Sequence, residues 1–212
     1  MYLYLYHNEG PKSRFAFSER LVRRALLDYA ARQELGIPDK ILINAAIAKE
    51  EKGKPYFADL REPDGKGRPA VHYSVSHSGD WWGCLMAGEP VGFDMEVCRD
   101  KVNYEKIAKR YFTEDEYGLV LSAGPEAFFD VWVRKEAYVK YSGSGLSVGL
   151  DSFSVVEGGK LVPQVIATDK ARNRPDCIVK SCITRPCEVG DGVKAAYCSA
   201  GGNSLKDIIS IQ

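Results

Sequence analysis

The amino-acid sequence predicts an α+β fold, because segments typical of helices and of strands occur in both halves of the chain. The chain has 212 residues, of which 45% are hydrophobic and 11% aromatic, which suits one or two compact domains. No linker rich in Gly, Pro or Ser separates independent modules, and no short repeat is present. We expect two units, residues 1–98 and 99–212, that divide just after the strand at 91–97.

The elements of the first unit are predicted from the alternation of apolar and polar residues in strands, from the spacing of apolar residues in helices, and from residues typical of turns. In chain order we expect a strand at residues 1–7, a helix that opens at Ser18 and ends at Gly36 and Pro38, a strand or short mixed segment at 40–60, a polar loop at 61–69, and three strands within 70–97, the last two joined at Gly88-Glu89-Pro90.

The second unit is predicted to hold three helices followed by strands. We expect one helix at 103–112, a second that opens with a capping box at Thr113–Glu116, and a third at 126–142. A hairpin around Gly158-Gly159 and strands near 177–184 and 193–199 should follow.

Composition excludes several classes of protein. Lys plus Arg and Asp plus Glu both number 29, so the net charge is zero and a nucleic-acid partner is not expected. The sequence has no apolar run that would span a bilayer and no signal peptide, so we expect a cytoplasmic protein with no membrane partner. The six cysteines form no Cys-x-x-Cys pair, and with three histidines they favour free buried thiols over a zinc site.

Two carboxylates share one face of the predicted strand VGFDMEV at 91–97. Asp94 and Glu96 are two residues apart, which places their Cα atoms ~7 Å from each other on the same side of a strand. If this face of the strand is exposed to solvent, the two charges keep the strand edge soluble, and for an isolated Asp-x-Glu this is the favoured interpretation. The alternative is that a cation lies between the two acids.

The helix at 126–142 carries charges among aromatic residues. Trp132, Glu136 and Lys140 are spaced at i, i+4 and i+8, so they share one face, and Lys135 lies beside it. A surface salt bridge would explain Glu136 and Lys140. The surrounding aromatics instead indicate a buried helix, where a metal ion and a phosphate would be suitable partners for these charges.

Two shorter motifs carry groups that suit an anionic ligand. In YSVSHSG, His77 stands between the hydroxyls of Ser76 and Ser78, either as an ordinary hydrogen-bonded histidine or as an anion-binding group. In GKPYF, Lys54 follows a glycine and precedes Pro55 and Tyr56; alone, this is an ordinary turn with a solvated lysine.

Taken together and in this order, GKPYF, SVSHSG, GFDMEV, FTEDE and WVRKEAYVKYSGSGLS resemble the 4′-phosphopantetheinyl transferase superfamily in its long (Sfp-type) form. The similarity runs from about Arg14 to the hairpin near 157. It implies two similar α/β subdomains packed as a pseudo-dimer around one active site. It also implies transfer of the 4′-phosphopantetheine arm of coenzyme A to a serine of an apo acyl or peptidyl carrier protein, which releases 3′,5′-ADP.

The resemblance also assigns roles to residues. Asp94, Glu96 and Glu136 would bind Mg²⁺, and Mn²⁺ accepts the same oxygen ligands. Glu136 is the first choice for the base and Glu116 the second, although the capping box explains Glu116 equally well; Lys140 would assist the leaving group. The expected coenzyme A contacts are Arg14, Lys54, Pro55, Tyr56, Ser76, His77, Ser78, Asp94, Glu136 and Lys140.

Further expectations concern partners and alternatives. The segment 142–150, with Tyr141 and Leu146 nearby, would face a fatty-acid, polyketide or nonribosomal-peptide carrier, and one chain would act as a monomer because it holds both halves. Only about a dozen residues precede Arg14, so the contacts with the nucleotide are expected to differ from those of longer members. The alternative functions are a catalytically silent coenzyme A- or carrier-binding protein and a metal-dependent phosphoesterase.

Overall fold

The chain folds as a mixture of helices and sheets, which confirms the predicted α+β class. The computed structural model describes residues 1–8, 18–62, 66–145, 149–173, 178–201 and 204–211. Its helices are α1 (Ser18–Arg32), α2 (Asp39–Asn44), α3 (Tyr104–Tyr111), α4 (Glu114–Ala123), α5 (Pro125–Ser142) and α6 (Asp169–Arg172), with a 3₁₀ turn at Leu150–Ser152. None of the described helices has both the length and the apolar character needed to cross a bilayer.

The strands form two main sheets and one small hairpin. The first sheet has the order β11-β1-β5-β4, and the second has the order β6-β10-β9-β8-β7. Their bounds are β1 (Tyr2–His7), β4 (His72–Ser78), β5 (Trp81–Ala87), β6 (Val91–Val97), β7 (Phe153–Glu157), β8 (Lys160–Ala167), β9 (Ile183–Pro186), β10 (Val193–Ser199) and β11 (Asp207–Ser210). The hairpin consists of β2 (Ile47–Lys49) and β3 (Pro55–Phe57).

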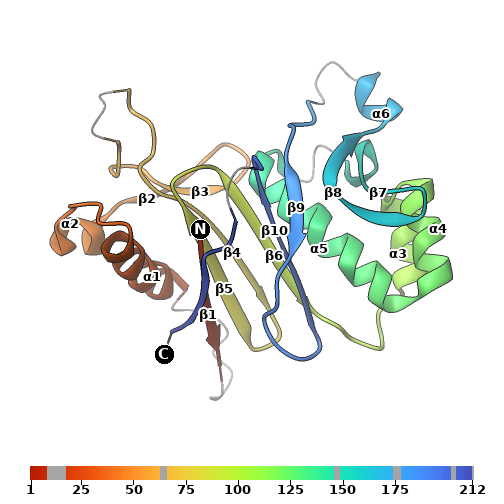
Figure 1. Cartoon of the computed structure of the whole chain (residues 1–212), viewed down its shortest axis with the longest axis horizontal. Coiled ribbons are helices and arrows are strands. Elements are labelled where there is room, and N and C mark those ends of the chain that lie inside the picture. The colour runs from red at the N-terminus through yellow and green to blue at the C-terminus, as the bar shows by residue number, and fades with distance from the viewer. Residues whose placement is uncertain (9–17, 63–65, 146–148, 174–177, 202–203, 212) are drawn as a thin grey trace.

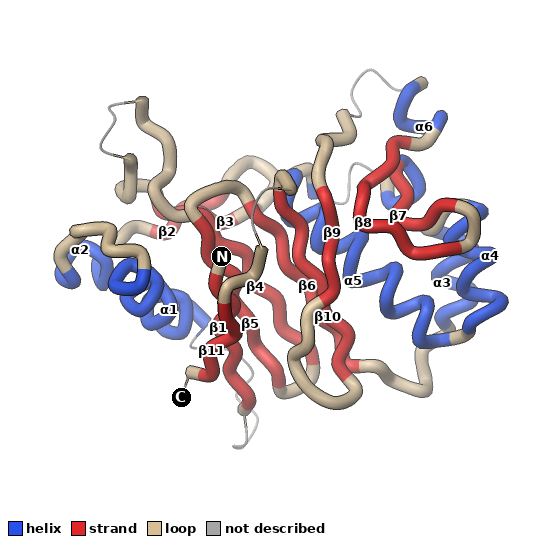
Figure 2. Tube along the Cα trace, viewed as in Figure 1, coloured by secondary structure: helices blue, strands red, loops and turns tan. Residues whose placement is uncertain are grey.

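Most strands of the two sheets lie in the middle of the molecule, between two groups of helices. Figure 1 shows α1 and α2 on one side and α3, α4 and α5 on the other, and Figure 2 shows β7 and β8 next to the second group. The buried residues of α1 pack with the first sheet, and those of α5 pack with the second. Each sheet therefore has its own helical cover, which is compatible with two subdomains, and the pseudo-dimer stays a prediction.

Two strands cross the predicted division at residue 98. β6 lies before it in sequence but pairs with β10 of the second sheet, while β11 from the far end of the chain pairs in parallel with β1. The division into 1–98 and 99–212 stays a prediction about two units, and it does not coincide with a boundary between the sheets.

Serine hydroxyls join β4 of the first sheet to β6 of the second. The backbone N–H of Phe93 donates to Ser74 Oγ over 3.0 Å, and that of Val97 donates to Ser78 Oγ over 3.0 Å. Ser76 Oγ accepts from the N–H of Met95 over 3.3 Å. Alternate side chains of one strand thus satisfy the backbone donors of the other, and we call this contact the serine seam.

Strand β6 approaches the backbone of α5 closely at Gly92. A methyl group on Gly92 would lie 1.9 Å from Ala137 O and 2.4 Å from Tyr141 N, so only a residue without a Cβ fits here. This contact brings the acidic strand and the charged helix together.

The structure places some elements differently from the sequence-based predictions. The segment 40–60 is a mixed one, with α2 followed by the β2–β3 hairpin. The strand predicted near 177–184 is β9, which begins at Ile183, so that prediction was placed too early. The predictions did not include α6 and β11; both have only four residues, too few for a periodic signal.

We expect the substitution Gly92→Ala to destabilise the protein, because the added methyl overlaps the backbone of α5. Overpacking of this kind lowers the free energy of unfolding by about 1–3 kcal/mol, which equilibrium urea denaturation measures. Gly118→Ala in α4 is the control: nothing lies within 4 Å of its added methyl, and a helical alanine should raise stability by up to about 1 kcal/mol. A Gly92→Ala variant that is as stable as wild type would contradict the close contact between β6 and α5.

Candidate active site

The two acids of β6 are held by serines of β4. Ser76 Oγ donates to Asp94 Oδ1 over 2.7 Å, and Ser78 Oγ donates to Glu96 Oε1 over 2.8 Å. Because a hydroxyl can donate and accept at once, each serine bridges the seam and orients a carboxylate. The Ser-x-Ser spacing of β4 therefore matches the Asp-x-Glu spacing of β6.

Asp94 also pairs with the charged helix. It is only 6% exposed, so the interpretation of this pair as a solvated strand edge is wrong for Asp94. Lys140 of α5 places Nζ 2.7 Å from Asp94 Oδ1 and donates to the carbonyl of Val75 over 3.2 Å. This ion pair brings the strand acid and the helix lysine into contact, and the roles predicted for both residues stay predictions.

Glu136 lies one helical turn before Lys140, and the charges of Asp94 and Lys140 both act on its carboxyl group. Burial raises the pKa of Glu136, the negative charge of Asp94 raises it further, and Lys140 acts in the opposite direction. A carboxylate whose pKa is raised is a stronger base than an ordinary one, and beside another carboxylate it is also suited to share a cation.

Asp94, Glu96 and Glu136 are the predicted metal ligands. Among the residues that the structure describes, no three His, Cys, Asp or Glu side chains gather closely enough to hold a metal ion. The chemistry of the three nevertheless fits Mg²⁺, which prefers oxygen ligands, and a cation would relieve the repulsion that raises the pKa of Glu136. Their role as ligands stays a prediction.

A cavity of about 280 Å³ lies beside Lys140. Three parts of the chain supply its walls: the turn of the β2–β3 hairpin, the middle of β4 and the end of α5. The lining residues are Lys52, Gly53, Lys54, Pro55, Tyr73, Ser74, Val75, Val139, Lys140, Gly143 and Gly145. A neighbouring cavity of about 220 Å³ shares Lys54, Pro55 and Tyr73 and adds Tyr56, Arg61 and His72.

The predicted coenzyme A contacts lie in different surroundings. Lys54, Pro55 and Lys140 line the cavities, together with Tyr56, while Ser76, Ser78, Asp94 and Glu136 form the polar cluster beside them. His77 is exposed on β4, where its role stays a prediction. Arg14 lies outside the described residues, as does Leu146 of the predicted carrier-facing segment.

Lys54 is partly buried where it lines the cavities. Its Nζ donates to the carbonyl of Tyr141 over 2.8 Å, and Val91 O lies at 3.4 Å. Burial lowers the pKa of Lys54 to about 8, an effect that Glu50 partly offsets. No local sequence pattern relates Lys54 to Tyr141, because the two residues are 87 positions apart along the chain.

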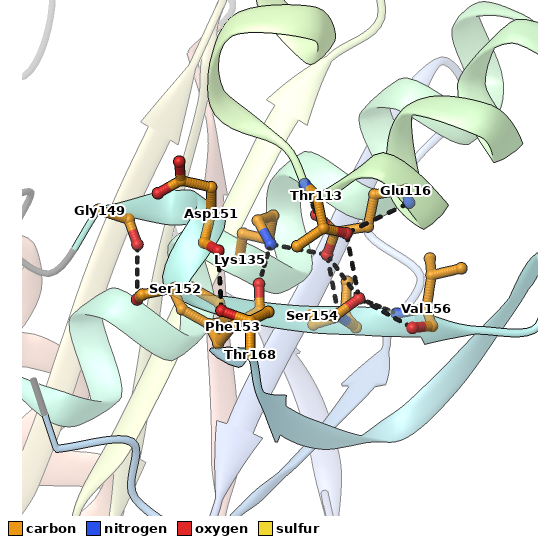
Figure 3. Close-up of polar contacts among 11 residues, drawn as sticks. Thr113, Glu116, Lys135, Gly149, Asp151, Ser152, Phe153, Ser154, Val156 and Thr168 are labelled. Atoms are coloured by element: carbon orange, nitrogen blue, oxygen red, sulfur yellow. Dashed lines mark hydrogen bonds and ion pairs between the residues drawn. The ribbon is translucent and has the colours of Figure 1, made fainter. Parts of the chain in front are cut away.

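Glu116, the second candidate for the base, is part of a buried ion pair. Glu116 and Lys135 are both 0% exposed, and Lys135 Nζ lies 2.6 Å from Glu116 Oε1 and 2.6 Å from Phe153 O. The N–H of Val155 donates to Glu116 Oε1 over 2.9 Å, and that of Thr113 donates to Oε2 over 2.9 Å, which confirms the capping box. Figure 3 shows this network, which ties α4, α5 and β7 together.

These contacts favour the structural interpretation of Glu116. In the part of the chain that the structure describes, its polar partners come from α4, α5 and β7, not from the acids of β6. Trp132 stacks on Phe128 with ring centroids 5.8 Å apart, as expected for core packing. The catalytic role predicted for Glu116 stays untested.

Comparison with known proteins identifies the family. The model of the 4′-phosphopantetheinyl transferase superfamily matches residues 90–198, from the start of β6 to β10. The chain belongs to the 4′-phosphopantetheinyl transferase superfamily. The matched segment contains Asp94, Glu96, Glu136 and Lys140, while Ser76 and Ser78 of the polar cluster precede it.

Individual members of the superfamily resemble the chain over most of its length. It is 31% identical over 207 residues to 4′-phosphopantetheinyl transferase ffp of Bacillus subtilis, a match that covers 93% of this chain and 83% of the relative. It is 32% identical over 171 residues to 4′-phosphopantetheinyl transferase Sfp of Bacillus subtilis strain 168, covering 78% and 67%. With 4′-phosphopantetheinyl transferase psf-1 of Bacillus pumilus the identity is 41% over 141 residues, covering 62% and 58%.

We expect Glu116→Gln to destabilise the protein by about 3–5 kcal/mol, because it leaves the ammonium of Lys135 buried without a counter-charge. The double variant Glu116→Leu/Lys135→Met removes both charges and should recover most of this loss. Urea denaturation measures both, with Glu114→Gln at the exposed start of the same helix as the control. If Glu116→Gln is as stable as wild type, the pair does not hold α4, α5 and β7 together.

The lowered pKa of Lys54 predicts a pH dependence of stability. Between a folded-state pKa of about 8 and the ordinary value of 10.5, the unfolded chain binds more protons at this lysine than the folded chain does. The contribution of Lys54 to stability therefore rises with pH across this window. We expect the free energy of unfolding of wild type to rise relative to that of Lys54→Met as pH increases, as measured by urea denaturation. A constant difference would contradict the burial of the charged ammonium.

Proposed function

We propose that the protein transfers the 4′-phosphopantetheine arm of coenzyme A to a serine of an apo acyl or peptidyl carrier protein, which yields the holo carrier and 3′,5′-ADP. The observation that carries this proposal is the convergence of Asp94 with Lys140 and Glu136 beside a cavity, within the segment that the superfamily model matches. The names of the similar proteins agree with this reaction.

In the proposed reaction, coenzyme A lies in the cavity with its pyrophosphate toward Lys140. The serine oxygen of the carrier forms a bond to the phosphorus that bears the pantetheine arm, and the bond from that phosphorus to the oxygen of 3′,5′-ADP breaks. Glu136 accepts the serine proton, for which its raised pKa suits it. Lys140 supplies positive charge, and if needed a proton, to the departing oxygen.

Asp94, Glu96 and Glu136 would together hold Mg²⁺, with Mn²⁺ as a substitute. When bound, the ion would neutralise charge on the pyrophosphate and favour the departure of 3′,5′-ADP. The chain's own contribution is to orient the acids: Ser76 and Ser78 fix one oxygen of Asp94 and one of Glu96. Lys140 already contacts Asp94, so acid, cation and lysine would act as one cluster.

The partner is expected to dock next to the end of α5. The proposed surface is the segment 142–150, of which residues 146–148 lie outside the described part of the chain. Carrier proteins are acidic, so basic side chains near this surface should speed encounter. We further propose that the enzyme acts as a monomer in the cytoplasm, as the family resemblance suggests.

The test is intact-mass spectrometry of apo carrier proteins incubated with this protein, coenzyme A and Mg²⁺. We expect a mass gain of one phosphopantetheine that EDTA abolishes, and a rate at least ~100-fold lower for Glu136→Gln. Glu126→Gln, on an exposed position of the same helix, should transfer at the wild-type rate.

Three outcomes would contradict parts of the proposal. No mass gain with acyl and peptidyl carriers would favour a catalytically silent binding protein, which calorimetry with coenzyme A would then test. Transfer that persists in EDTA would remove the metal from the mechanism. Wild-type transfer by Glu136→Gln would remove Glu136 from both of its roles.

A further inference from the structure

The ammonium of Lys54 contacts two carbonyl groups from different elements of the fold. Tyr141 O, at 2.8 Å, belongs to the last turn of α5, and Val91 O, at 3.4 Å, belongs to the first residue of β6. Lys54 itself precedes β3 of the small hairpin. One side chain therefore links the hairpin, the acidic strand and the charged helix.

The last carbonyl groups of α5 require hydrogen-bond donors from outside the helix. The last carbonyls of a helix have no partner within the helix, and the negative end of the helix dipole favours a cation there. Gly143 ends α5 in the left-handed conformation. The carbonyl of Tyr141 accepts from Lys54, and that of Ser142 accepts from Lys180 Nζ over 2.9 Å.

The shape of the hairpin turn supports the same contact independently. The turn is closed by hydrogen bonds of 2.8 Å from Glu50 N to Lys54 O and from Gly53 N to Glu50 O. A methyl group on Gly143 would lie 2.9 Å from Glu50 Oε2 and 3.5 Å from Lys54 Cδ. The turn thus packs directly against the end of α5, and Lys54 of this turn donates a hydrogen bond to the helix.

These three elements form the candidate active site. The hairpin turn lines the cavity, β6 carries Asp94, and Lys140 directly precedes Tyr141 on α5. We infer that Lys54 is a positioning residue: its ammonium holds the hairpin turn, the start of β6 and the end of α5 together, and its main role is not to bind a phosphate of coenzyme A. This inference rests on the proposed function and departs from the role that the family resemblance assigned to Lys54.

The two roles differ in which substrate they affect. A lysine that binds the 3′-phosphate of coenzyme A would favour coenzyme A over dephospho-coenzyme A, which lacks that group. A lysine that positions Asp94 and Lys140 would matter equally for both substrates and would act mainly on kcat, because misplaced catalytic groups slow the chemical step.

The experiment compares Lys54→Met with wild type on both substrates, using an apo carrier protein and intact-mass detection. We expect kcat to fall by about 10- to 100-fold with each substrate and by the same factor, with little change in KM. A loss confined to coenzyme A and seen in KM would overturn the inference and restore phosphate binding.

Lys180→Met is the matched control. Lys180 donates to the next carbonyl of the same helix end, but it does not line the cavity. We expect this variant to retain kcat within about 2-fold, because it leaves the hairpin attached. An equal loss in both variants would show that the helix end alone, and not its link to the hairpin, controls the rate.

Hydrogen exchange without substrate separates failure of this inference from failure of the proposed function. In Lys54→Met, peptides covering 47–57 and 139–145 should exchange faster than in wild type, and in Lys180→Met only the second should. Unchanged exchange at 47–57 would overturn the inference even if transfer falls. Lys54→Gln, which keeps a neutral donor, provides the same comparison if the methionine variant does not fold.

Discussion

The contact between β6 and α5 at Gly92 is the constraint on which the rest of the candidate site depends. A side chain at this position would overlap Ala137 O, so the helix can approach the strand only where the strand has no Cβ. Asp94 lies two residues further along β6, and Lys140 one turn after Glu136 on α5. Once the two backbones touch, the side chain of Lys140 can reach Asp94, and the two form an ion pair of 2.7 Å. The chemistry of the site thus depends on backbone packing.

The serine seam adds a second constraint from the other sheet. β4 and β6 belong to different sheets. Serine hydroxyls of β4, and not backbone carbonyls, accept from the N–H groups of Phe93, Met95 and Val97 on β6. Ser76 and Ser78 then have a proton left to donate to Asp94 and Glu96. The same groups that join the sheets therefore orient the acids, so the position of the acids is tied to the alignment of the sheets.

The sequence predicted the local features well and the long-range contacts poorly. The acidic strand, the helix of Glu136 and Lys140 and the capping box at Thr113 follow from periodicity within a few residues. That Asp94 and Lys140 belong to one site was expected only through resemblance to a family, and their direct contact was not expected. The bond from Lys54 to Tyr141 and the pairing of β11 with β1 join segments that no local pattern relates. A solvated edge was a reasonable interpretation of Asp94 and Glu96 until the neighbouring β4 was known.

Two lysines of α5 show how burial decides what a charge can do. Lys135 is fully buried, bonded to Glu116 and to Phe153 O, and its ammonium lies 4.4 Å from the ring centroid of Phe153. No solvent or substrate reaches it, so its charge serves the packing of α4, α5 and β7. Lys140, five residues later, has a side chain that is 30% exposed and lines a cavity. Water and a ligand in the cavity can therefore reach its ammonium. Of the two, only Lys140 is accessible to a ligand.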